Sequence, residues 1–257
     1  MKFLCLTLGL AALAIAPAPA KPDLGLGDNE SLVYHVSWAI LPGVGAIRVD
    51  AKATSDPTGR PFLRVTTQTA TRGLARILLP FDGEAESLFD RAKERLVWMG
   101  ESTTMRDQHK AHTVTFDYRR GQATYVDGAD PAHPRILAMP PGYPTDLITC
   151  LLYARTWNLR PGQARDALVL FEDEFYQLTI HAIGYESIVT PLGEFNTLIL
   201  EPRMEKTPPL GMFRRGSTVR VWIAQDPRRL PVRFRVQFKF GTGVAMLAEY
   251  HPPTAAQ

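Results

Sequence analysis

Residues 231–240 read PVRFRVQFKF, and this stretch decides the class of fold. Valine and phenylalanine occupy alternate positions, and Arg233, Arg235, Gln237 and Lys239 lie between them. Successive side chains of a β-strand point to opposite faces, so a period of two gives one apolar face and one cationic face. Such a strand buries one face against a core and leaves the other in water, as strands of antiparallel sheets commonly do.

The same alternation recurs along most of the chain. Further strands are predicted at residues 32–40, 44–49, 62–71, 81–89, 95–103, 112–118, 122–126, 168–183, 185–190, 195–200 and 217–223. The 19 glycines and 21 prolines supply many turns between them. Many short strands that are separated by turns predict an antiparallel sandwich or barrel.

One segment, residues 145–157, predicts a helix, because its apolar residues recur at spacings of three and four. Thr145 or Asp146 can cap its start. We therefore expect residues 21–257 to form a single, mainly β domain. Its predicted architecture is a many-stranded antiparallel barrel or a strongly curved sheet, with the one helix packed against it.

The N-terminus has the pattern of an export signal. A positively charged start is followed by an apolar run at residues 3–16 and by Ala-Pro-Ala at residues 18–20, which signal peptidase reads as a cleavage site. An apolar run of about 14 residues is short for a helix that spans a bilayer. We expect residues 1–20 to be removed and the rest to be a soluble periplasmic protein without a transmembrane segment, or a secreted one.

Composition narrows the class of protein further. Hydrophobic residues make up 45% and charged residues 21%, which is typical of a globular protein. A formal net charge of +3 is too small to indicate nucleic-acid binding. Once the signal is removed, Cys150 is the remaining cysteine, so no internal disulfide is expected.

Four blocks of sequence carry a resemblance to a known family. They are YHVSW at 34–38 with PGVG at 42–45, PTDL at 144–147 running into LYAR at 152–155, the TPLG turn within 184–197, and VWI at 221–223 with Asp226 and RLPVR at 229–233. In this order they resemble a family of bacterial exported proteins that is catalogued as a domain of unknown function. The resemblance implies a mainly β protein of the cell envelope, and it brings no catalytic residues.

The cationic face of the last hairpin is the candidate binding site. If residues 217–223 pair with residues 231–240, Arg220 lies opposite Arg233 or Arg235, and like charges in that position repel. A negative group is therefore expected beside Arg220, Arg233, Arg235 and Lys239. It could be an anionic lipid headgroup, a glycan phosphate or an acidic partner surface. The alternative is a carboxylate of a neighbouring strand, for which Glu186, Glu201 and Glu249 are available.

Other chemistry is poorly supported. His109 and His112 are three residues apart in a predicted strand, which points them to opposite faces, so no metal or other cofactor is predicted. The acidic residues 172–174 lie at a predicted bend, and paired carboxylates such as Glu84 and Glu86 catalyse glycoside hydrolysis only at a defined separation. The sequence lacks the serine-hydrolase, zinc-protease, phosphate-loop and dinucleotide motifs, and no catalytic residue is assigned.

The leading hypothesis is a non-enzymatic envelope protein that binds or shuttles an amphiphilic or anionic component. An apolar concavity would hold the tail, and the cationic face would hold the head. The first alternative is a structural or protein-interaction module with a fully packed core. The second is a hydrolase of an envelope polymer, which would require a cleft with a carboxylate pair or a serine near a histidine.

Overall fold

The backbone is built almost entirely from antiparallel strands. A computed structural model describes residues 25–209, 213, 216–239 and 241–254, so the predicted signal at residues 1–20 lies outside the described residues. The strands are β1 (Ser31–Trp38), β2 (Leu41–Ser55), β3 (Pro61–Thr71), β4 (Phe81–Asp90), β5 (Arg95–Met105), β6 (Gln108–Asp117), β7 (Gln122–Asp127), β8 (Arg135–Ala138), β9 (Ala164–Phe171), β10 (Glu174–Thr190), β11 (Gly193–Arg203), β12 (Thr218–Ala224), β13 (Pro231–Phe238) and β14 (Gly241–His251). The mainly β prediction is confirmed.

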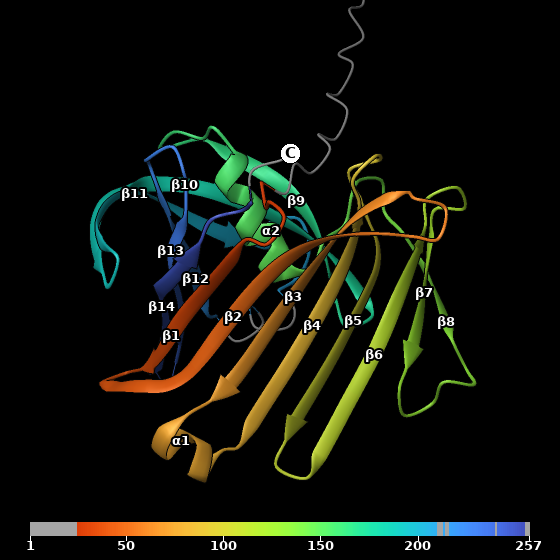
Figure 1. Cartoon of the computed structure of the whole chain (residues 1–257), viewed down its shortest axis with the longest axis horizontal. Coiled ribbons are helices and arrows are strands. Elements are labelled where there is room, and N and C mark those ends of the chain that lie inside the picture. The colour runs from red at the N-terminus through yellow and green to blue at the C-terminus, as the bar shows by residue number, and fades with distance from the viewer. Residues whose placement is uncertain (1–24, 210–212, 214–215, 240, 255–257) are drawn as a thin grey trace, which may run out of the picture.

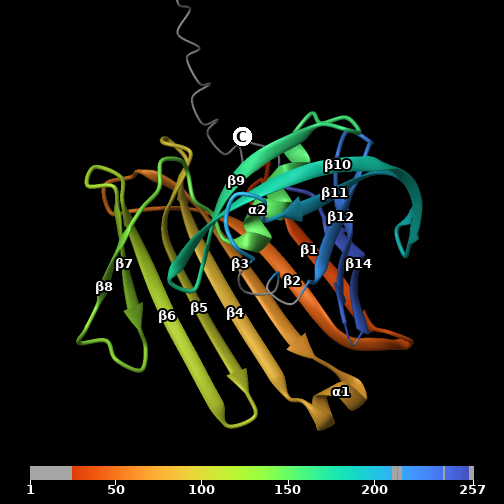
Figure 2. The same ribbon diagram turned by 180° about the vertical axis from the view of Figure 1, so that it is seen from behind.

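These strands form one 14-stranded sheet in the order β8-β7-β6-β5-β4-β3-β2-β1-β14-β13-β12-β11-β10-β9. The first strand pairs with the last, and the sheet curls strongly on itself (Figures 1 and 2). Its edge strands β8 and β9 do not pair with each other. Of the two predicted architectures, the curved sheet is confirmed, and the closed barrel is not formed.

Another segment pairs with part of the edge of β9. Thr145 forms a parallel bridge with Val169, in which the Thr145 N–H donates to the Leu168 carbonyl at 3.1 Å and the Thr145 carbonyl accepts from the Leu170 N–H at 2.9 Å. Two backbone groups of this edge strand, the Leu168 carbonyl and the Leu170 N–H, are thereby satisfied without β8, and covering an edge in this way protects it.

The predicted helix is present but shorter than expected. Helix α2 (Leu147–Tyr153) continues as a 3₁₀ turn, η1 (Ala154–Thr156). The Asp146 side chain accepts a hydrogen bond from the Thr149 N–H at 2.8 Å and caps the helix, so the start lies two residues later than residue 145. The helix lies inside the curled sheet (Figure 1). We call the face of the sheet that carries α2 the inner face.

The core fills much of the inner face. One cluster runs from β1–β7 into β9–β14 and includes Leu32, Tyr34 and Phe89, and a second packs α2 and η1 against β9–β12. Tyr34 donates its hydroxyl to the Pro231 carbonyl at 2.9 Å, so this buried ring links β1 to β13. Cys150 is fully buried in the second cluster, and burial raises the pKa of its thiol to about 12.

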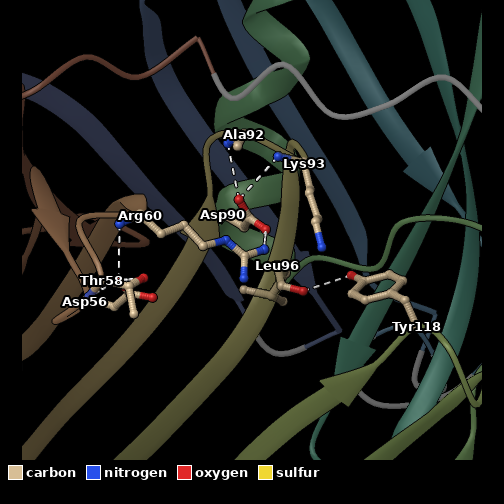
Figure 3. A network of polar contacts seen from close by, with 8 residues as sticks. All are labelled: Asp56, Thr58, Arg60, Asp90, Ala92, Lys93, Leu96 and Tyr118. Atoms are coloured by element: carbon tan, nitrogen blue, oxygen red, sulfur yellow. Dashed lines mark hydrogen bonds and ion pairs between the residues drawn. The ribbon is translucent and has the colours of Figure 1, made fainter.

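Polar side chains hold the turns at one end of the sheet, here called the capped end (Figure 3). The buried Asp90 at the end of β4 accepts hydrogen bonds from the backbone N–H groups of Ala92 and Lys93 at 3.1 and 3.2 Å. Its carboxylate also forms an ion pair with Arg60, which brings in the turn between β2 and β3. Nearby, the Tyr118 hydroxyl donates to the Leu96 carbonyl at 2.8 Å.

Candidate functional site

The predicted cationic face lies on β12 and β13, on the side of the sheet away from α2. Arg220 lies directly opposite Arg235, and Trp222 lies opposite Arg233, so the predicted juxtaposition of like charges is confirmed. A bulge between Trp222 and Ile223 shifts the register beyond this point. The side chains of Val219 and Val221 point the other way, into the core around α2, which fixes which face is cationic.

Arg220 is neutralised by a carboxylate of the neighbouring strand. Its Nε donates to Glu201 Oε2 at 2.7 Å, and Glu201 Oε1 accepts from Arg203 at 2.8 Å. Burial opposes the ionisation of Glu201, but the two guanidinium groups outweigh it and hold the pKa of Glu201 below its ordinary value. Glu201 is one of the three carboxylates that the sequence offered for this role.

Arg233 is held by an aromatic ring. Its guanidinium lies 4.5 Å from the centre of the Trp222 ring, and the Trp222 indole N–H donates to Glu186 at 2.7 Å. Burial lowers the pKa of Arg233, while the charge of Glu186 opposes that change. Glu249, the third available carboxylate, lies on β14 opposite Val33 of β1. Its charge helps to raise the pKa of Arg48, after the larger effect of Asp50.

The charges of Arg235 and Lys239 are not neutralised by an ion pair among the described residues. Arg235 donates to the neutral side chain of Gln237 at 3.0 Å, and Lys239 is exposed in the turn between β13 and β14. No ion pair joins either of them to a carboxylate among the described residues. The uncompensated charge of the cationic face therefore lies toward the end of the sheet that is opposite to the capped end.

That opposite end carries a group of exposed apolar side chains that the sequence reasoning missed. We call it the apolar rim. Its members, with exposed fractions between 44% and 93%, are Ile40, Leu41, Leu74, Ile77, Leu78, Leu79 and Met105. They come from the β1–β2 turn, from the short helix α1 (Gly73–Leu78) and the residue after it, and from the end of β5 (Figure 1). Helix α1 has no buried residue.

The three parts of the apolar rim are neighbours in space. The Arg72 N–H before α1 donates to the Val44 carbonyl at 2.8 Å, which ties α1 to the strand that follows Ile40 and Leu41. The Pro80 carbonyl after α1 accepts from the Arg106 N–H at 3.1 Å, beside Met105. Exposed apolar side chains gathered at one end of a folded domain usually mark an interaction site.

Basic side chains surround the apolar rim. Arg72 and Arg106 are exposed, and Arg76 forms an ion pair with Asp82 at 2.7 Å. Lys239 lies at the same end of the sheet, because the β13–β14 turn follows the residues that pair near Trp38. Apolar residues with flanking cations are the combination by which peripheral proteins bind anionic membrane surfaces.

The apolar character continues from this end onto the inner face. The rings of Trp38 and Phe238 lie 5.8 Å apart, and both are only partly buried. A Cβ atom on Gly241 would come within 2.8 Å of the Trp38 ring, so the indole packs directly on the glycine backbone. Gly241 also has φ of +156°, which a larger residue rarely adopts.

One signal in the sequence could have indicated the apolar rim. Residues 77–79 read ILL and precede Pro80, in a connection between two predicted strands. Turns are normally polar, so three consecutive apolar residues in a turn indicate either burial or a binding surface. The same stretch alone does not reveal that Ile40 and Met105 join it, because that depends on the order of the strands.

Two further observations bear on the class of protein. Among the residues with an assigned structure, no helix has both the length and the apolar character needed to cross a membrane. Within the same part of the chain, no three His, Cys, Asp or Glu side chains gather in a way that could hold a metal ion.

Comparison with known proteins supports the fold. The family model described as "Protein of unknown function (DUF3108)" matches residues 33–248. No curated protein matches the chain. A solved structure of a beta-barrel-like protein from Brucella abortus, of the domain of unknown function DUF1849, is similar over 88% of this chain and 99% of its own, with 5% identity and a TM-score of 0.56.

Two other solved structures are more distant. A protein from Bacteroides fragilis, described as exported and as having a YmcC-like fold, has 10% identity and a TM-score of 0.31, with 87% of this chain and 96% of its own covered. A protein from Parabacteroides distasonis, described as a lipoprotein, has 11% identity and a TM-score of 0.30, with 87% and 95% covered.

Proposed function

The chain belongs to the DUF3108 family of proteins of unknown function, and we propose that it is a non-enzymatic protein of the periplasm that binds anionic amphiphiles. In this proposal the apolar rim enters the hydrocarbon boundary of a membrane, and the basic side chains beside it contact the anionic headgroups. The observation that carries the proposal is the gathering of seven exposed apolar side chains at one end of the sheet.

The apolar side chains contribute substantially to the free energy of membrane binding. Moving a leucine or isoleucine side chain fully out of water stabilises the bound state by about 1.5–3 kcal/mol. Helix α1 alone presents Leu74, Ile77 and Leu78, each about three-quarters exposed. Even partial burial of these three in a membrane therefore favours binding by several kcal/mol, before the entropy that is lost on binding.

The charges add selectivity for anionic surfaces. A lysine or arginine close to an anionic membrane contributes about 1 kcal/mol, and salt screens this contribution. Arg72, Arg106 and Lys239 are exposed at the apolar rim, and Arg235 lies near it on the cationic face. Of the four residues predicted from the sequence, the proposal thus assigns the membrane contact to Arg235 and Lys239. Arg220 and Arg233 support them from within the sheet.

Aromatic surface lies beside the apolar rim on the inner face. Trp38 and Phe238 are partly exposed next to the apolar rim, so an acyl chain that leaves the membrane would meet aromatic surface at once. An exposed apolar surface marks a contact with either a protein or a membrane. The basic side chains beside the apolar rim are what favour an anionic membrane over a protein partner in this proposal.

The experiment that tests the proposal is vesicle flotation with the chain from residue 21 onward. We expect the protein to float with vesicles that contain phosphatidylglycerol and to stay in solution with pure phosphatidylcholine. Raising the salt concentration to about 0.5 M should weaken binding, because the Debye length falls well below 10 Å. Equal binding to both kinds of vesicle, or to neither, would contradict the proposal.

The role of the cationic face is tested by the double substitution Arg235→Glu and Lys239→Glu. Binding to phosphatidylglycerol vesicles should fall at least about tenfold, because two attractive charges become repulsive. The matched control is Arg91→Glu with Lys93→Glu, which makes the same change of charge in the exposed β4–β5 turn at the capped end. The control should bind nearly as well as the unchanged protein. An equal loss in both variants would show that binding depends on net charge alone and not on the position of Arg235 and Lys239.

A further inference from the structure

A second site lies on the inner face, between β5–β8 and the β9–β10 turn. It is a cavity of about 700 Å³. In Figure 2 the β9–β10 turn passes in front of the sheet near β4 and β5, and Figure 1 shows the same turn behind them. The residues that matter for its chemistry are Glu101, His112, Tyr125, Asp127, Glu172 and Asp173.

The cavity is acidic. Four carboxylates line it, against the basic side chains of Lys110 and Arg135. Arg135 is already engaged, because it forms an ion pair with Asp173 and lies 4.5 Å from the centre of the Tyr125 ring. That ion pair also joins the edge strand β8 to the β9–β10 turn. The remaining charge of the cavity favours a cation and disfavours the anionic headgroups that the apolar rim and the cationic face attract.

One buried polar atom in the cavity lacks a hydrogen-bond partner. The Nε2 atom of His112 is buried without a partner, and its side chain is only 11% exposed. Its nearest carboxylate oxygen, Oε2 of Glu101, is 3.9 Å away, which is too far for a hydrogen bond. Buried polar atoms in folded proteins nearly always have a partner, so a partner for His112 Nε2 is expected beside Glu101.

The electrostatics of the cavity favour an entering cation. Burial lowers the pKa of His112, against the charges of Glu172, Asp127 and Asp173, so the ring is neutral and one of its nitrogen atoms can accept. Burial raises the pKa of Glu101, and the negative charges of Asp146 and Glu172 raise it further. A cation that enters here relieves the repulsion among these carboxylates.

We propose that this cavity binds the ammonium group of a primary amine, which donates hydrogen bonds to Glu101 and His112 beside the ring of Tyr125. An amine suits the cavity better than a metal ion, because no three potential ligands of the described residues converge on one point. His112 and Tyr125 stack with their ring centres 5.1 Å apart, which gives the carbon chain of the amine an apolar surface.

The test is a titration with butylammonium, followed by two-dimensional NMR of the whole chain from residue 21. We expect saturable shifts in the amides of β5–β7, and none with butanol, which has the same shape without the charge. The substitution Glu101→Gln keeps the size of the side chain and removes its charge, and it should weaken binding about tenfold or more. The matched control is Glu84→Gln on the outer face, where Glu84 accepts from Gln68; it should leave binding unchanged.

The proposal is overturned if butylammonium produces no saturable shifts, or if Glu101→Gln and Glu84→Gln bind it equally well. A further arm identifies the source of the amine. If adding phosphatidylethanolamine to the vesicles strengthens binding of the unchanged protein but not of Glu101→Gln, the ammonium belongs to a lipid headgroup. If it makes no difference while butylammonium still binds, the ligand is a free amine. Because butylammonium is measured without vesicles, the ammonium site and the membrane proposal can fail separately.

Discussion

Replacing Ile40, Leu74, Ile77 and Leu78 together by aspartate is expected to abolish binding to phosphatidylglycerol vesicles, with a loss of at least about a hundredfold. These four side chains are between 75% and 93% exposed, so the unbound protein loses little packing. The bound state loses several kcal/mol of apolar burial and gains four charges that repel the headgroups. A hundredfold loss corresponds to only about 2.8 kcal/mol.

The control for this variant uses exposed apolar residues elsewhere on the surface. Ile136, Ile183, Val189 and Leu192 are between 40% and 72% exposed, and they lie on β8 and on the β10–β11 hairpin. Their replacement by aspartate adds the same charge and should cost much less binding. Thermal unfolding of both variants, followed by circular dichroism, checks that the fold is kept. If the rim variant still floats with the vesicles, the membrane proposal is wrong.

The substitution Arg155→Met is expected to lower the free energy of unfolding by about 3–5 kcal/mol, because it leaves a buried carboxylate without its partner. Arg155 donates to Glu30 at 2.7 Å, and the side chains are 8% and 1% exposed. Arg155 also donates to the Arg228 carbonyl at 2.9 Å, and Glu30 accepts from the Gly27 N–H at 3.0 Å. The ion pair thus joins the N-terminal segment, η1 and the β12–β13 turn.

Urea unfolding measures this effect, and two further variants interpret it. Glu30→Gln combined with Arg155→Met removes both charges and should recover much of the loss, since an unpaired buried charge costs more than a missing pair. Arg228→Met breaks the exposed ion pair with Asp226, where Arg228 is 53% exposed, and should cost at most about 1 kcal/mol. A small effect of Arg155→Met would show that water reaches Glu30 and that the Arg155–Glu30 ion pair contributes little to stability.

Two of the sequence blocks that carried the family resemblance meet at this place. Arg229 begins the block RLPVR, and its guanidinium donates to the carbonyls of Arg155 and Trp157, both at or just beyond the block LYAR. Arg229 lies 74 residues after Arg155 and 72 residues after Trp157 in the sequence, so no local pattern indicates this contact. Their arrangement indicates a structural role, because the arginine satisfies carbonyl groups at the end of η1 that the helix leaves unpaired.

The cationic face shows how far sequence reasoning reached for the site. The alternation in residues 231–240 predicted Arg233 or Arg235 opposite Arg220, because the period of two leaves few registers open, and the structure places Arg235 there. The neutralisation of Arg220 by Glu201 was only one of three possibilities in the sequence. It was decided by β11 lying next to β12 and by Glu201 sharing the outer face.

The sequence by itself determined most of the strands, a helix start at Thr145 or Asp146 and the amphipathic faces, because these depend on neighbours within a few residues along the chain. It did not predict β8 or β14, and the structure selected Asp146 as the cap. Only the tertiary structure decided that the sheet stays open, that the turns near Ile40, Leu78 and Met105 form one apolar end, and that an acidic cavity lies under the β9–β10 turn. The physical reason is that each of these features joins segments distant in sequence, and their meeting depends on strand order and sheet curvature, which no local pattern specifies.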